Sequence, residues 1–343
     1  MVARRQFGRQ FGRSLRLALA AGMLASLAAC SVNPATGQRQ FSMIGRSQEI
    51  ALGSEAQPQL TAEYGGEIPS ASIRSYVRTL GQNLAQHTEA DYPSLPWEFT
   101  VLNSEVINAF ALPGGKVFIS RGLMQKMTNE AQLAAVLGHE IGHVTARHAN
   151  DGIFRQTIAG LGTKVAEAAA GAEVANAVDT AGNLIVLRYS RNQELQADAL
   201  GMRYMTKAMY NPQGVRQVME ILKAAAGGSG GGLDSFFSTH PDPDARIQQA
   251  DRLIASEYSF TQGDARYKLN ESEFRANFLS KLSSLPPATP SARTVARLPD
   301  GRFDLRNTAS WCGVCAAQQS HSPQARAHTH APTPVDGAAL ASR

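Results

Sequence analysis

The stretch EAQLAAVLGHEIGHVTARH, residues 130–148, decides how this chain is organised. Its apolar positions recur at helical spacing and predict a helix with one buried face. His139 and His143 are four residues apart, so both imidazoles project from one face, a turn from each other. Two imidazoles at this spacing can bind one metal ion, with Glu140 directed toward a bound water. We interpret His148, at the predicted end of the helix, as a positive charge that faces the helix dipole.

A third metal ligand is expected to be anionic. Two neutral imidazoles leave the charge of a zinc ion uncompensated, and a catalytic zinc site keeps its fourth position open. The segment SRNQELQADAL, residues 190–200, begins with a predicted capping box of Ser190 and Gln193. Glu194 and Asp198 then share one helix face, and position alone allows either to be the ligand. We predict Glu194 as the ligand and Asp198 as hydrogen-bond acceptor for a ligand imidazole, in a site for one zinc ion per chain.

A small sheet is predicted upstream of this helix. WEFTVL at residues 97–102 and AFALPGGKVFIS at residues 109–120 are typical of strands, and the PGG sequence folds the second stretch into a hairpin. With helical segments around them, the fold class is α+β and mainly helical. Residues 109–112 either form a sheet edge that adds hydrogen bonds to an extended substrate or belong to an ordinary core hairpin. The candidate substrate contacts here are Asn108, Ala109, Phe110 and Ala111.

Two further basic residues follow the glycine-rich segment GGSGGG, residues 227–232, which is flexible enough to let the first of them move. His240 has three interpretations: a donor to the oxyanion of the reaction, a fourth ligand that closes the open metal position, or a structural residue of a turn. Arg246 could bind a substrate carbonyl, or it could pair with Asp242 or Asp244 near the start of its own helix. The sequence leaves these alternatives open.

These motifs together resemble a known family of zinc metallopeptidases. It includes the HtpX-type heat-shock proteases, the type I CAAX prenyl endopeptidases and the BepA-type periplasmic lipoproteins. The resemblance rests on NPATG (33–37), NAFALPGG (108–115), HEIGH (139–143), ELQAD (194–198) and STHP (238–241). It implies a zincin-like fold with an edge strand beside the HExxH helix, and endopeptidase activity. It also implies zinc bound by His139, His143 and Glu194, with Glu140 as the general base toward a zinc-activated water.

The resemblance also suggests a class of substrate. No multi-span membrane body accompanies the motifs, so a prenylated substrate is not expected. Similarity to the periplasmic branch implies hydrolysis of misfolded or stalled envelope proteins. The alternative is a periplasmic chaperone or assembly factor for outer-membrane proteins, with a mostly latent zinc site, that acts with the outer-membrane assembly machinery.

The N-terminus predicts export from the cytoplasm. Residues 1–16 are Arg-rich, and residues 17–29 are apolar but too few to span a membrane, which is typical of a signal peptide. The sequence LAAC that ends at Cys30 resembles a bacterial lipobox, which implies that Cys30 is acylated and anchors the mature chain to a membrane. Ser31, in place of Asp, implies sorting to the outer membrane, facing the periplasm.

Charge excludes nucleic acid as a partner. The chain has 33 Lys+Arg against 28 Asp+Glu, a net charge of +5. Five arginines and no acidic residue precede position 30, so the remaining chain carries 28 residues of each sign. A neutral chain has no bulk charge with which to attract a phosphate backbone.

The predicted organisation has five parts: a signal peptide (1–29), a lipidated cysteine with a polar tether (30–46), the metallopeptidase domain (47–258), a helical extension (259–282), and a Pro/Ser/His-rich, largely disordered tail (283–343). The tail contains Cys312 and Cys315 in a CxxC spacing. A local disulfide, a weak metal site with the tail histidines, and a redox motif are all compatible with that spacing. The last would make the protein a redox lipoprotein.

Overall fold

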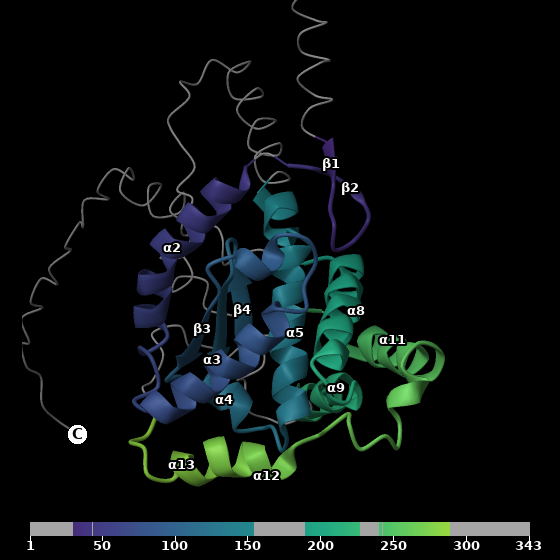
Figure 1. Ribbon diagram of the computed structural model, residues 1–343. Coiled ribbons are helices and arrows are strands. Elements are labelled where there is room, and N and C mark those ends of the chain that lie inside the picture. The colour runs from purple at the N-terminus through teal and green to yellow at the C-terminus, as the bar shows by residue number, and fades with distance from the viewer. Residues whose placement is uncertain (1–29, 43, 154–188, 227–239, 242, 289–343) are drawn as a thin grey trace, which may run out of the picture.

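The computed structural model describes residues 30–42, 44–153, 189–226, 240–241 and 243–288 (Figure 1). The predicted fold class, α+β and mainly helical, is confirmed. The strands are β1 (Cys30–Val32), β2 (Arg39–Phe41), β3 (Glu98–Leu102), β4 (Ala109–Leu112) and β5 (Lys116–Ser120). The longer helices are α2 (Arg46–Glu63), α3 (Ala71–Ala85), α5 (Glu130–Thr145), α8 (Arg191–Lys207), α9 (Gln213–Ala226) and α11 (Pro243–Ser256). The short elements are η1 (Tyr92–Ser94), α4 (Arg121–Met124), η3 (Ser259–Thr261), α12 (Glu271–Phe274), η4 (Arg275–Leu279) and α13 (Ser280–Leu282).

The larger sheet has three strands in the order β3-β5-β4. The central strand β5 is parallel to β3 and antiparallel to β4, with Ala109 opposite Ile119. The predicted hairpin joins β4 to β5, and its glycines Gly114 (φ 78°) and Gly115 (φ 90°) adopt the left-handed conformation that residues with a side chain rarely take. Because β4 pairs only with β5 among the described strands, it forms an edge of this sheet.

Helix α5 lies at the centre of the molecule. Figure 1 shows it between the sheet on one side and α8 and α9 on the other, and it contacts β4, α3, α8 and α9. The sequence predicts one buried face, but all residues of α5 except Val144 are buried. The difference arises because neighbours cover the helix on several sides, including the side that carries its polar residues. Chemistry on this helix therefore takes place in an interior with a low dielectric constant.

The segment after Cys30 forms hydrogen bonds with the body of the protein. Asn33 Nδ2 donates to Thr145 O over 2.9 Å, and Gln40 Nε2 donates to Ala146 O over 2.6 Å. These carbonyls belong to the C-terminal turn of α5, where a helix leaves its acceptors without internal partners. The segment thus caps the helix that carries the HExxH motif.

The residues after 258 pack into the same hydrophobic core as the helices before them. Phe274 and Phe278 are fully buried in this cluster. Arg121 Nη1 donates to Pro286 O over 2.7 Å, which binds the end of the described chain to α4. Residues 259–282 therefore contribute side chains to the main hydrophobic core.

Several sequence predictions lie outside the described residues. These are the signal peptide, Asp242 as a partner of Arg246, the glycine-rich segment, and the tail with Cys312 and Cys315. In the part of the chain that the structure describes, no helix is both long and apolar enough to cross a membrane.

Candidate metal centre

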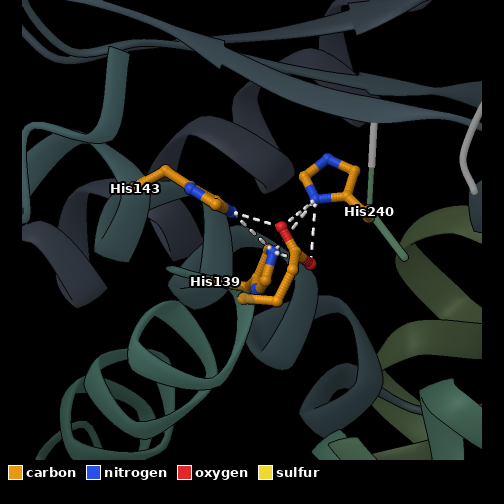
Figure 2. Close-up of side chains that lie close together, drawn as sticks. His139, His143 and His240 are labelled. Carbon is orange, nitrogen blue, oxygen red and sulfur yellow. Dashed lines mark hydrogen bonds and ion pairs between the residues drawn. The ribbon is translucent and has the colours of Figure 1, made fainter. Parts of the chain in front are cut away.

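Four side chains from three parts of the chain converge beside α5. His139 and His143 come from α5, Glu194 comes from the first turn of α8, and His240 precedes α11. One ligand atom of each lies within 4.8 Å of the others, and all four residues are buried. Figure 2 shows the three imidazoles converging. The capping box of Ser190 and Gln193 begins α8 as predicted and so places Glu194 at the start of that helix.

The separations of the donor atoms fit a tetrahedral zinc ion. His139 Nε2 lies 3.0 Å from His143 Nε2 and 3.3 Å from His240 Nδ1. Glu194 Oε1 lies 3.3 Å from His143 Nε2 and 3.0 Å from His240 Nδ1. Zinc–ligand distances of about 2.0–2.1 Å place tetrahedral ligands about 3.3 Å apart. The donor set of imidazoles and a carboxylate also suits zinc.

Glu194 and Asp198, which position along the helix alone did not distinguish, take different places in the structure. Glu194 lies among the imidazole nitrogens, whereas Asp198 Oδ1 accepts from His139 Nδ1 at 2.8 Å. That hydrogen bond leaves the proton of His139 on Nδ1 and the lone pair of Nε2 directed toward the other donors. Asp198 therefore orients an imidazole without entering the donor cluster.

Arg246 is part of the same buried network, whereas its predicted partner Asp242 lies outside the described residues. Its Nε donates to Asp198 Oδ2 over 2.7 Å, and its Nη1 lies 2.9 Å from Glu194 Oε2. The predicted pairing with Asp244 is wrong, because Asp244 pairs with Lys223 at 2.6 Å. The side chain is 1% exposed and its nitrogens contact carboxylates, so no open guanidinium remains for a substrate carbonyl. Spacing along α11 could not reveal partners on α8.

The net charge of the buried side chains favours binding of a divalent cation. Burial opposes ionisation of Glu194 and Asp198, but Arg246 beside both, with His240 beside Glu194, keeps the pKa of each carboxyl below its usual range. Glu140, Glu194 and Asp198 are thus three buried carboxylates around one guanidinium, that of Arg246. When all three are ionised, two negative charges stay uncompensated, and a zinc ion would balance them.

Glu140 lies beside the donor cluster without belonging to it. Its Oε1 is 3.8 Å from His240 Nε2. Both carboxylate oxygens are buried and lack a hydrogen-bond partner among the described residues. Burial raises the pKa of Glu140 above its usual value, although His240 and His139 act against this. A buried carboxylate without a hydrogen-bond partner is costly and is typical of a functional group.

Sequence reasoning missed the role of His148. The residue is 1% exposed and lies beyond the end of the helix, beside His143. Helix α5 ends at Thr145, and Arg147 then adopts a left-handed conformation (φ 56°). This turn brings His148 Nδ1 within 2.8 Å of His143 Nδ1. Tyr189, which was also missed, stacks on His143 with ring centroids 3.8 Å apart. In the sequence, only the presence of a histidine five positions after His143 pointed to such contacts.

The candidate substrate contacts lie along the edge strand, close to the metal centre. Ala109 is fully buried, while Phe110 and Ala111 are partly exposed. Asn108 precedes the strand and is buried, with its Nδ2 donating to the hydroxyl of Tyr64 over 3.2 Å. A hollow beside β4 is lined by Ala111, Leu112, Gly114, His143 and Tyr189, among others. The edge strand and a donor imidazole therefore border one surface depression.

Close packing of α5 on α8 sets the distance between the ligands. A Cβ atom on Gly142 would lie 2.8 Å from Ala197 O, and one on Gly201 would lie 2.7 Å from His139 N. We expect Gly142→Ala to lower the free energy of unfolding by about 1–3 kcal/mol, because the backbones must separate. Urea denaturation of the metal-free protein measures this. Unchanged stability would show that the helices have room to move apart.

Comparison with known proteins identifies the family. Residues 72–254, just over half of the chain, match the model of peptidase family M48. The mitochondrial metalloendopeptidase OMA1 of Schizosaccharomyces pombe is 33% identical over 233 residues, which cover 64% of this chain and 65% of that protein. The beta-barrel assembly-enhancing protease of Escherichia coli is 28% identical over 258 residues, or 72% of this chain and 52% of that protein.

The two matches cover 64% and 72% of this chain, and the chain spans between about half and two thirds of the lengths of these relatives. The part that matches the family model includes the HExxH helix, the edge strand and Glu194. The chain therefore belongs to peptidase family M48, a family of zinc metallopeptidases.

Proposed function

We propose that this protein is a zinc-dependent endopeptidase. The observation that carries the proposal is the convergence of His139, His143, Glu194 and His240 within 4.8 Å, beside the carboxylate of Glu140, which lacks a hydrogen-bond partner among the described residues. The metalloendopeptidases among its relatives support the same activity. His139, His143 and Glu194 would hold the metal, and His240 is a fourth donor.

The residues of the chain divide the chemistry among them. Bound zinc would supply a Lewis acid that polarises a carbonyl and acidifies water. Glu140 accepts a proton from the attacking water and delivers it to the leaving amine, a role that suits a carboxylate whose pKa is raised by burial. The edge strand β4 offers unpaired backbone groups to an extended substrate, which would be held beside the donor cluster.

For the substrates we propose misfolded or stalled proteins of the bacterial cell envelope. The lipobox-like sequence at Cys30 supports a lipid-anchored protein, placed at the outer membrane and facing the periplasm. A relative whose name describes the enhancement of beta-barrel assembly supports envelope substrates and contact with outer-membrane assembly machinery.

A second candidate function is a chaperone or assembly factor whose zinc site is mostly latent. The position of His240 favours it, because His240 Nδ1 lies 3.0 Å from Glu194 Oε1 and 3.3 Å from His139 Nε2. An imidazole there would close the fourth position that a catalytic zinc site keeps open.

Zinc content and casein cleavage, measured on the full chain purified in detergent, test the first proposal. We expect about one zinc per chain, and cleavage that stops after chelation and returns with zinc. Absence of zinc would overturn the site assignment. Zinc without cleavage in the wild type and in every variant would favour the chaperone.

The His240→Ala variant tests whether His240 closes the site. We expect it to retain zinc through the other three donors and to cleave casein about tenfold faster, because the open form becomes the main population. The half-buried His87 provides the matched control, since its replacement by Ala should change neither zinc content nor cleavage. Slower cleavage with zinc retained would instead assign His240 a direct role in the reaction.

A further inference from the structure

The far side of His143 contacts a chain of two polar side chains. His143 Nδ1 lies 2.8 Å from His148 Nδ1, and His148 Nε2 lies 2.8 Å from Gln196 Oε1. His143 and His148 are 2% and 1% exposed, and Gln196 is half-buried on α8.

The amide oxygen at the end of this chain determines where the protons lie. Gln196 Oε1 can only accept, so His148 must carry its proton on Nε2. In a neutral His148, Nδ1 then has a lone pair and can accept from His143 Nδ1. With its single proton on Nδ1, His143 has a lone pair on Nε2, the atom that lies 3.0 Å from His139 Nε2 in the donor cluster.

We propose that His148 and Gln196 are positioning residues that fix His143 in the tautomer able to bind zinc through Nε2. The inference rests on the proposed zinc site. It gives His143 the same kind of support that Asp198 gives His139, but through a neutral imidazole and an amide instead of a carboxylate.

The surroundings of His143 support this assignment. An imidazole that binds a metal is neutral and carries a single proton, so His143 must hold that proton on the nitrogen that faces away from the donor cluster. The stacked Tyr189 ring, inclined by 24°, restricts rotation of the imidazole. The opposite proton arrangement would place an N–H of His143 among the donor atoms, where it would prevent metal binding.

Two variants of His148 with nearly equal shape test the proposal. In His148→Asn, Oδ1 takes the place of Nδ1 and still accepts from His143, whereas His148→Leu provides no acceptor. Zinc affinity of the full chain in detergent is measured by competition with a chromophoric chelator. We expect His148→Leu to bind zinc about 10–100-fold more weakly than the wild type, and His148→Asn to recover most of this loss. Equal affinity of His148→Leu and the wild type would overturn the proposal.

If His148→Leu fails to fold, a second pair of variants, at Gln196, tests the same proposal. Gln196→Glu keeps an acceptor for His148 Nε2, whereas Gln196→Met has a similar length and accepts only weakly. We expect zinc affinity to fall for Gln196→Met and to be maintained for Gln196→Glu, while equal affinities would overturn the inference. A wild type that binds no zinc would instead disprove the proposed function.

Discussion

Replacement of Glu140 by Gln is expected to leave zinc bound and to slow casein cleavage by about 10²–10⁴-fold, the usual contribution of a general acid–base group. Glu140 lies outside the donor cluster, so the metal keeps its ligands. The amide has nearly the same shape but cannot accept the proton. Zinc content and initial cleavage rates, measured on the same preparation, separate the two effects.

A matched surface variant shows whether the loss of any carboxylate would slow cleavage. Glu220, on the exposed face of α9, pairs with Arg216 at 3.0 Å, and Glu220→Gln should cleave at the wild-type rate. Loss of zinc from Glu140→Gln would place Glu140 in the metal-binding set. Retention of both zinc and activity would remove it from the mechanism.

Replacement of Arg246 by Leu is expected to lower the free energy of unfolding by about 3–5 kcal/mol, the cost of leaving a buried charge without its partner. Asp198 accepts two hydrogen bonds from Arg246, from Nε and Nη2, each over 2.7 Å, and Glu194 lies 2.9 Å from Nη1. Removal of the guanidinium leaves both carboxylates buried beside Glu140. Urea denaturation of the chelated protein measures the loss without any contribution from bound metal.

The surface residue Arg216 supplies the control for this experiment. It forms ion pairs with Glu220 and Asp251 in solvent, and its side chain is 39% exposed. Arg216→Leu should therefore cost no more than about 1 kcal/mol. A similarly small loss for Arg246→Leu would show that the buried carboxylates are neutral or are solvated by another route.

Much of the metal centre could be predicted from the sequence. Helical periodicity places His139 and His143 on one face, and a capping box fixes the start of the helix that carries Glu194. The hairpin at Gly114 and Gly115 was equally predictable, because its backbone conformation favours glycine. These features depend on residues that are close together in the sequence, so a local sequence pattern is enough to predict them.

The roles of Arg246 and His148 could not be predicted in the same way. Arg246 has acidic neighbours on its own helix, yet its partners Asp198 and Glu194 lie on another helix, about fifty residues away in sequence. The helix ends three residues earlier than predicted, and a left-handed turn follows at Arg147. His148 is therefore a buried neighbour of His143 and not the last residue of the helix.

The sequence by itself determined the ligand types and their helices, because donor spacing and capping are local. Only the tertiary structure decided which carboxylate joins the imidazoles, what Arg246 contacts and where His240 lies. Those relations depend on how α5, α8 and α11 pack, including the close contact of Gly142 with the α8 backbone. Burial strengthens electrostatic interactions and makes unpaired charges costly, so each polar group here depends on partners that the packing supplies.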